Sequence, residues 1–490
     1  MRLINLLCCL LLVFSTAYSQ TTKFQISNET KILGKNYINN SDIEGVEYVF
    51  PERIEDYFLD PSTNFLTVRL RGLTSDKKWL KNTGNILQYD LKNKKVLWSK
   101  HFSYLWNDLV QFSKTMIYTN MSNSYKLDPY TGKDLWRVKN KIFLAYPNIG
   151  VGYKYNAWLG YVNRLEGIDL INGKRIWKRK TAGRWHGMSD LFYINDSTLL
   201  MVSFGLLTIN KNTGMGWDYF IVTNADSYSG LMSNVIADST FVYMASSNQL
   251  VKLDKQFGNV AWKFPFRHNL TTKSTIFMDD SLVYMINRGF GFRGRQQVNC
   301  GRAFVAAFDR QTGAQKYFTL INKENGSILD LYLLKKEIIL LFQNKMMKYN
   351  LETGTEISEK EFPEEDFGEL RFFIGQQVFI DNQHGYFFSL AQNDSTNLHI
   401  YTNEKKIVSV NNHLNVMNTI ELEDTGICYL HVKDYKFIAS EKKTFIINNE
   451  GKKIAELEIT KDAFLIEDIL YDIQDRSFIA IDTKTLNLKF

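Results

Sequence analysis

Short runs in which hydrophobic and polar residues alternate dominate the chain, as in Tyr125-Lys126-Leu127. Alternation with a period of two is typical of half-buried β-strands, and no segment sustains the 3.6-residue period of an amphipathic helix. The apolar stretch from Ile328 to Phe342 is broken by Lys335-Lys336-Glu337, so it predicts two strands around a charged turn. Aromatic residues, which favour strands, make up 14% of the chain. The pattern therefore predicts an all-β protein.

A motif repeats along the chain: an acid or amide, usually a glycine four residues later, and an aromatic residue seven or eight residues later. Its clearest copies are Leu127 to Trp136 and Ile168 to Trp177. From Asp90 to Asn350 the spacings between successive anchors are 38, 41, 41, 44, 55 and 41 residues. A period of about 40–45 residues with several short strands in each unit is typical of a β-propeller.

Each copy of the motif predicts a hairpin turn. The acidic or amide side chain can accept the backbone N–H two residues later, and glycine adopts the positive φ at which the chain reverses. The Trp is expected to pack between neighbouring sheets, so we interpret the repeat anchors as structural and not catalytic. These anchors are Asp90, Trp98, Asp128, Gly132, Trp136, Asp169, Gly173, Trp177, Trp217, Asp254, Trp262, Asp309 and Gly313.

The repeats resemble the pyrroloquinoline-quinone-like (PQQ-like) propeller repeats, whose consensus combines an Asp, a Thr-Gly-Lys turn and a Leu-Trp pair. The resemblance is strong over residues 89–358 and weaker over 359–490. It implies an all-β fold, a single β-propeller of four-stranded blades, with eight blades as in the family.

The number of blades stays open between seven and ten. The 132 residues between the anchors at 350 and 482 leave room for two more hairpins, which we expect near 407–412 and Asn448. A strand from residues 22–58 could close the ring. No linker rich in Pro, Gly or Ser divides the chain, so we predict one propeller domain over residues 20–490.

Residues 1–19 have the pattern of a secretory signal peptide. Arg2 is followed by an apolar run to Phe14, and Ala17 and Ser19 place small residues at the cleavage site before Gln20. The run is shorter than the about 20 residues that span a bilayer. We therefore expect a secreted or periplasmic protein with no transmembrane segment after cleavage. Cys8 and Cys9 lie too early in this segment for lipid attachment.

Charge and cysteine content exclude several classes of protein. The chain has 59 Lys and Arg against 52 Asp and Glu, a net charge of +7, which does not identify a nucleic-acid binder. After signal cleavage two cysteines remain, Cys300 and Cys428, too few for a disulfide framework. The seven His residues form no close pair and no Cys-x-x-Cys exists, so no zinc or other metal site is expected.

The 55-residue spacing marks an inserted loop at residues 288–302. Gly289 to Gly294 matches the pattern G-x-G-x-x-G, but a dinucleotide site needs a helix directly afterwards and none is predicted. Two interpretations remain: a solvated loop, or a basic and aromatic lip that binds an anionic partner. The candidate binding residues are Arg288, Phe290, Phe292, Arg293, Arg295 and Arg302.

For function, we expect an exported, non-catalytic binding or scaffolding propeller that engages a protein or an anionic envelope ligand through its inter-blade loops. The resemblance includes a lipoprotein scaffold of the outer-membrane barrel-assembly machinery, whose lipid attachment this sequence lacks. One alternative is a quinoprotein dehydrogenase with PQQ and calcium, yet the vicinal Cys8-Cys9 pair lies in the signal peptide. Another is a hydrolase or lyase with carboxylates at the central channel. No catalytic residue and no cofactor is assigned.

Overall fold

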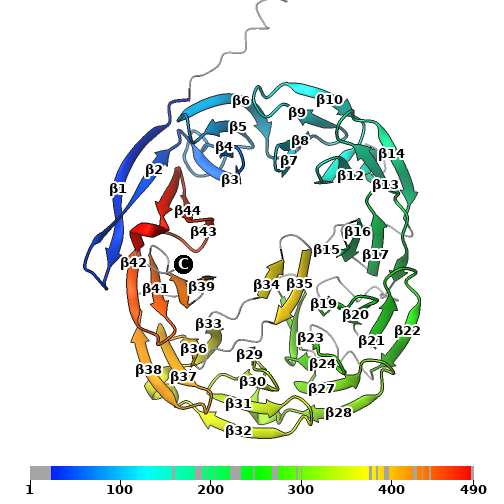
Figure 1. Ribbon diagram of the computed structural model, residues 1–490, viewed down its shortest axis with the longest axis vertical. Coiled ribbons are helices and arrows are strands. Elements are labelled where there is room, and N and C mark those ends of the chain that lie inside the picture. Colours follow the sequence, from blue (N-terminus) through cyan, green and yellow to red (C-terminus); the bar gives the residue numbers. More distant parts are fainter. Residues whose placement is uncertain are drawn as a thin grey trace, which may run out of the picture.

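Antiparallel sheets stand side by side around a central channel, and each sheet has one edge strand at the channel and extends outward from it (Figure 1). The alternating pattern produces this arrangement because each strand buries one face against each neighbouring sheet. The ring comes from a computed structural model, which describes residues 24–156, 160–181, 190–195, 197–202, 205–220, 233–246, 249–266, 274–293, 296–299, 301–374, 378–381, 385–390, 397–422, 427–432, 434–440 and 443–486.

Within these residues the strands form ten units of four, taken here from the channel outward. The first five units are β3 (Arg53–Asp60), β4 (Phe65–Arg71), β5 (Thr83–Asp90), β6 (Lys95–Ser103); β7 (Asp108–Phe112), β8 (Thr115–Thr119), β9 (Ser124–Leu127), β10 (Asp134–Val138); β11 (Lys141–Ala145), β12 (Ile149–Asn156), β13 (Gly160–Asp169), β14 (Arg175–Lys180); β15 (Asp190–Asn195), β16 (Thr198–Val202), β17 (Gly205–Asn210), β18 (Asp218–Phe220); β19 (Val235–Ala237), β20 (Phe241–Ser246), β21 (Gln249–Asp254) and β22 (Val260–Pro265).

The other five units complete the ring. They are β23 (Thr275–Met278), β24 (Leu282–Asn287), β27 (Phe304–Asp309), β28 (Gln315–Leu320); β29 (Asp330–Leu333), β30 (Glu337–Leu341), β31 (Lys345–Asn350), β32 (Glu356–Glu361); β33 (Leu370–Ile374), β36 (Asn397–Thr402), β37 (Lys406–Asn411), β38 (Val416–Glu421); β39 (Ile427–Val432), β40 (Tyr435–Ala439), β41 (Thr444–Asn448), β42 (Lys453–Leu457); β43 (Phe464–Ile466), β44 (Ile469–Gln474), β45 (Ser477–Asp482) and β2 (Asp42–Val49).

The all-β propeller is confirmed, and the described strands form ten four-stranded units, which is within the predicted range of seven to ten and more than the eight that the resemblance implied. The two additional units are the eighth and ninth, whose turns follow Asn411 and Asn448. Neither unit carries a Trp at the repeat position, which is why the sequence motif is weak there. Helical structure in the described chain is confined to α2 (Glu364–Phe367), η2 (Lys323–Asn325) and η3 (Thr483–Leu486).

The N-terminal strands close the ring, as the sequence suggested. β2 is the outer strand of the tenth unit and pairs with β45, for example Val46 opposite Ala480. β1 (Ser27–Asn36) then pairs with both β2 and β42 of the ninth unit. At Gly34 the backbones approach so closely that a Cβ would lie 2.1 Å from the Glu456 carbonyl oxygen. Glycine is therefore required at this seam.

The core lies between neighbouring blades. Ile286 of the sixth unit and Leu340 of the seventh, for example, are fully buried in one cluster. Near the outer edge, Trp98 covers Gly132 of the next unit, where a Cβ would lie 2.6 Å from the indole, and its Nε1 donates to the Pro129 carbonyl at 2.9 Å. The same packing recurs for Trp136 over Gly173, Trp177 over Gly214, Trp217 over Gly258 and Trp262 over Gly313.

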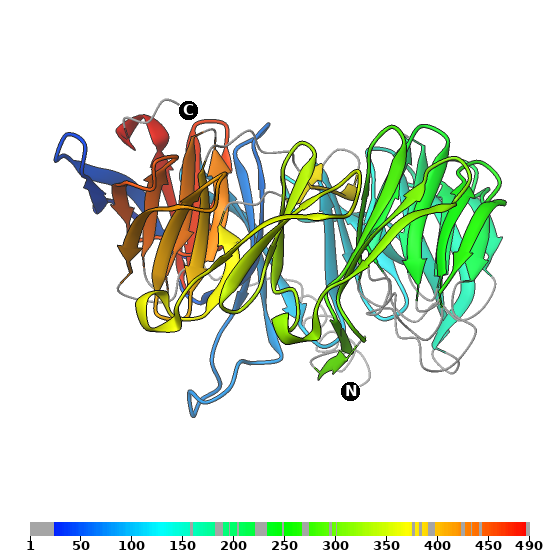
Figure 2. The same cartoon turned by 90° about the horizontal axis from the view of Figure 1, so that it is seen from below.

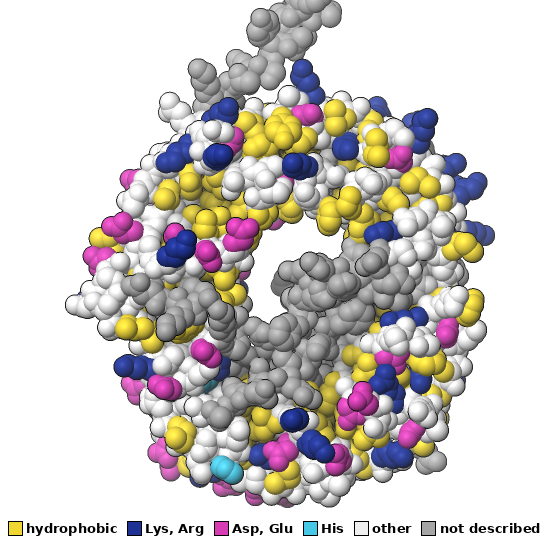
Figure 3. All heavy atoms as spheres, in the orientation of Figure 1, with side chains coloured by type: hydrophobic (Ala, Val, Ile, Leu, Met, Phe, Trp, Pro, Cys, Tyr) yellow, Lys and Arg dark blue, Asp and Glu magenta, His cyan; other side chains and the backbone are white. Residues whose placement is uncertain are grey.

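The turn that carries each anchor has the geometry its residues favour. Asp128 Oδ1 accepts the backbone N–H of Tyr130 at 2.9 Å, and Gly132 has φ of 67°. The backbone N–H two positions later donates in the same way to the side chains of Asp169, Asn210, Asp254, Asp309 and Asn350. We call the side of the ring that carries these turns the turn face. Figure 3 shows this face, with basic and acidic side chains interspersed around an opening at the centre.

Insertions lie at the opposite ends of the strands, and we call that side the insertion face. Residues 72–82 between β4 and β5 form a long hairpin, the arm, which projects beyond the ring (Figure 2). The short pair β25 (Phe290–Arg293) and β26 (Gln296–Asn299) projects from the same side. A third insertion, β34 (Val378–Asp381) and β35 (Gly385–Leu390), differs from these two: it connects β33 and β36 at the turn-face end of the eighth unit and reaches inside the ring to β15 of the fourth (Figure 1).

Candidate functional site

The inserted loop at residues 288–302 is a β-hairpin between β24 and β27 of the sixth unit. Phe290 lies opposite Asn299, and Arg293 lies opposite Gln296. The G-x-G-x-x-G pattern therefore falls on a strand and not before a helix, which agrees with the exclusion of a dinucleotide site. The hairpin lengthens one repeat and places new side chains on the insertion face without changing the blade beneath it.

Two of the six candidate binding residues are tied to the scaffold. Arg288 donates from Nη1 to the Leu329 carbonyl at 3.0 Å, and its Nη2 lies 3.5 Å from Asp330 Oδ1. Asp330 also accepts the backbone N–H of Phe373 at 2.9 Å, so the pair joins three successive blades. Burial raises the pKa of Asp330, while the Arg288 charge opposes that rise. Arg288 is therefore a seam residue, and Arg302 likewise donates to the Ile321 carbonyl at 2.9 Å.

A groove of about 670 Å³ lies at the base of the hairpin. Exposed Arg302 and Lys323 supply positive charge, and Phe290 supplies an aromatic surface. Among the described residues, none that lines the groove is acidic, so this lining favours an anionic group. The lining residues are Gly289, Phe290, Gly301, Arg302, Ala303, Ile321, Asn322, Lys323, Gly326 and Ser327.

The structure thus brings Phe290 and Arg302 to one groove, while Arg288 is held in the seam and does not line it. It places Phe292 and Arg293 on β25 without describing their side chains, and Arg295 lies outside the described residues. These three candidates remain predictions. Sequence reasoning did not anticipate Lys323, because it lies on the connection to the next blade and meets the hairpin only in the folded ring.

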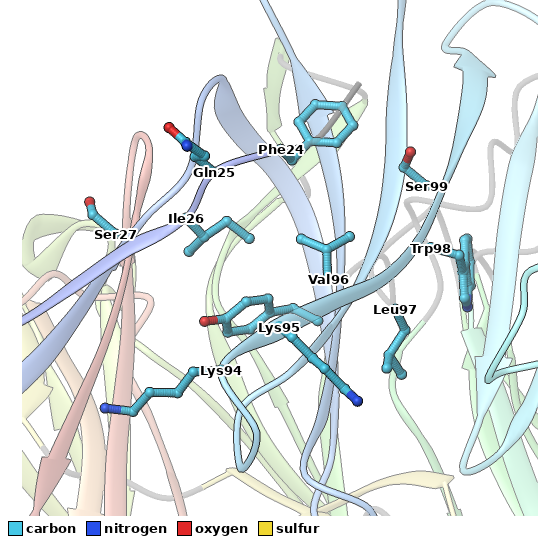
Figure 4. Close-up of a pocket in the computed structure, with 11 residues that line it drawn as sticks. Phe24, Gln25, Ile26, Ser27, Lys94, Lys95, Val96, Leu97, Trp98 and Ser99 are labelled. Atoms are coloured by element: carbon cyan, nitrogen blue, oxygen red, sulfur yellow. The ribbon is translucent and has the colours of Figure 1, made fainter. Parts of the chain in front are cut away.

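A second hollow, of about 620 Å³, lies at the perimeter near the turn face. The N-terminal segment passes beside the outer strand of the first unit, and Figure 4 shows Phe24, Ile26 and Val96 around the space between them. Lys94 at its edge donates to Asn28 Oδ1 at 3.0 Å. Tyr89 also lines it, and burial raises the pKa of Tyr89 to about 12. The hollow therefore follows from the way the N-terminal segment joins the ring.

A charged network links the fifth and sixth units. Asp238 Oδ2 accepts from Arg310 Nη2 and from the Tyr243 hydroxyl, each at 2.8 Å. Burial alone would raise the pKa of Asp238, but these and two backbone hydrogen bonds outweigh it and lower the pKa to about 2. The carboxylate stays ionised at neutral pH, which suits a structural ion pair and not a general acid.

The equivalent acid in the next unit is Asp279. It accepts from the Tyr284 hydroxyl at 2.6 Å. In both units the Tyr stands five positions after the acid, and this spacing is the sequence signal that would have found the pair.

Comparison with known proteins finds a family whose sequences are similar to part of the ring. Residues 73–264 match a sequence family described as outer membrane protein assembly factor BamB. No curated protein matches the chain. Similar solved structures include BamB from Moraxella catarrhalis, with 13% identity, a TM-score of 0.35 and coverage of 71% of this chain and 96% of that one. A eukaryotic initiation factor has 11% identity, a TM-score of 0.38 and coverage of 71% and 92%.

No helix among the described residues has the length and apolar character needed to cross a membrane. No three His, Cys, Asp or Glu side chains of the described chain gather where they could hold a metal ion.

Proposed function

Because the chain is a β-propeller with PQQ-like repeats, we propose that it is an exported binding or scaffolding protein that holds a partner and catalyses no reaction. The partner is a protein with an acidic segment, which binds the groove at the base of the β25–β26 hairpin. The proposed compartment is the periplasm or the exterior of the cell, reached through the signal peptide at residues 1–19. The proposal involves no cofactor.

One observation carries this proposal: a groove of about 670 Å³ on the insertion face, whose described lining includes basic and aromatic residues and no acid. Arg302 and Lys323 stand at this groove, and Arg guanidinium groups suit bidentate contacts with carboxylates. The repeat anchors are occupied by packing and turn formation, so binding is assigned to loops on a rigid scaffold. The similarity of residues 73–264 to the BamB family supports the proposal that this propeller is a scaffold that binds protein.

The test compares binding and stability in matched variants. An Arg293→Ser/Arg295→Ser double variant, made in the chain from Gln20 onward, should weaken capture of an envelope partner about tenfold, or about 1.4 kcal/mol. Its melting temperature should stay unchanged. Wild-type capture should fall as salt rises, because exposed charges are screened within about 8 Å at physiological ionic strength.

Arg288→Ser is the control for a structural arginine. It removes the ion pair of Asp330, so it should destabilise the fold by about 1–3 kcal/mol. If the double variant instead melts early and captures the partner as well as wild type, its arginines belong to the scaffold. A Lys323→Ser variant tests the groove itself, and if it too captures the partner as well as wild type, the binding site lies elsewhere on the ring.

A further inference from the structure

The arm, residues 72–82, exposes large apolar side chains far from the core. Trp79 is 72% exposed and Leu73 is 50% exposed. Figure 2 shows that this hairpin projects from the insertion face further than the neighbouring connections of its blade. Exposed apolar groups of this size on a projecting segment are unfavourable in water unless they meet another surface.

The arm is held by its own hydrogen bonds. The Thr74 N–H donates to the Trp79 carbonyl at 2.7 Å, and the Lys81 N–H donates to the Gly72 carbonyl at 2.9 Å. Asp76 Oδ1 accepts from the Thr74 hydroxyl and from the Lys78 N–H, and these bonds lower the pKa of Asp76. The tip is thus a formed turn that presents Trp79 outward, and little ordering is needed when it binds.

More exposed apolar groups surround the base of the arm. Leu105 and Trp106, 59% and 56% exposed, follow β6, and the Tyr104 N–H donates to the Asn82 carbonyl at 2.9 Å. Met121, 41% exposed, lies in the corresponding turn of the second unit. The apolar character therefore continues from the tip of the arm onto the insertion face.

The tip also carries unneutralised positive charge. Lys77 and Lys78 are exposed, and no carboxylate in the described part of the chain lies within ion-pair distance of either ammonium. Asp76 is the one acid of the arm and stays ionised, so together with Lys77, Lys78 and Lys81 it gives the arm a net charge of +2. The arm thus combines an indole, a leucine and a net positive charge.

We propose that the arm docks this protein on an anionic phospholipid surface. Trp79 and Leu73 enter the interfacial region, where indole rings are favoured, and Lys77 and Lys78 contact the headgroups. The arm is convex and exposes little area, whereas stable protein interfaces bury about 1,200–2,000 Å² in total. A lipid surface requires no matching concavity. This surface is additional to the proposed protein-binding groove and does not depend on it.

Vesicle binding tests this proposal directly. The chain from Gln20 onward contains every described element and lacks the apolar signal segment, so its vesicle binding can be assigned to the folded ring. It should co-sediment with phosphatidylcholine vesicles that contain about 30% phosphatidylglycerol, and less with pure phosphatidylcholine, because each lysine near an anionic surface adds about fivefold in affinity. Raising salt should release it.

Two arm variants and two controls complete the design. Trp79→Ala and Lys77→Ser/Lys78→Ser should each weaken binding at least about fivefold without a change in melting temperature. Phe257→Ala and Lys174→Ser alter exposed residues of the turn face and should bind as wild type.

Two outcomes would overturn the proposal. The first is an absence of binding to anionic vesicles at low salt. The arm would then dock into a cleft of a partner protein and not on a lipid surface. The second is binding that Trp79→Ala and the lysine variant leave unchanged, which would place the lipid contact on another part of the ring.

Discussion

Replacing Trp177 tests the seams between blades. Trp177 lies on β14, is 8% exposed, packs on Gly214 of the next unit and donates from Nε1 to the Lys211 carbonyl at 2.7 Å. A buried indole removes about 200 Å² from water, which at about 25 cal/mol per Å² corresponds to about 5 kcal/mol. Trp177→Ala should therefore destabilise the protein by about 3–5 kcal/mol, in the range measured for buried aromatic truncations.

Urea unfolding followed by far-UV circular dichroism measures this loss, and the chain supplies its own calibration series. Trp136 occupies the same repeat position but is only half-buried, so Trp136→Ala should destabilise less. Trp79 is 72% exposed, and Trp79→Ala should change stability by less than about 0.5 kcal/mol. A loss below about 1 kcal/mol for Trp177→Ala, or equal losses for all three, would refute the argument that these indoles stabilise the seams.

Two further predictions concern charge and ring closure. Because the pKa of Asp238 is lowered to about 2 from its ordinary 3.8, its ionised form adds stability that should be present above pH 4 and lost as pH falls toward 2. Asp238→Asn should flatten that part of the stability profile, and an unchanged profile would contradict the assignment. Gly34→Ala should open the seam between β1 and β42, since its Cβ would meet the Glu456 carbonyl oxygen at 2.1 Å. The N–H groups of Tyr37 and Glu458 donate across this seam to the Ile454 and Leu33 carbonyls, so faster exchange of these two amides would reveal the opening, and unaltered protection would count against it.

The sequence predicted what is encoded within about ten residues. Asp128, Gly132 and Trp136 specify a turn, a reversal and a packing residue, and this local chemistry recurs often enough to indicate a propeller. It also located the inserted hairpin, because one repeat is 55 residues long. The weak anchors at Asn411 and Asn448 are amides without a following Trp, so the motif alone could not settle the count.

The tertiary structure decided what depends on residues far apart in the chain. β2 completes a sheet with β45 from the other end of the sequence, and Arg288 meets Asp330 of the next blade. The same ion pair divides the candidate site: Arg288 belongs to the scaffold, while Lys323 joins the groove from a connection that no motif marks. Closure of the ring decides which side chains become neighbours. The repeat pattern of the sequence does not contain this information, because each repeat encodes its own turn and not its distance from the other repeats.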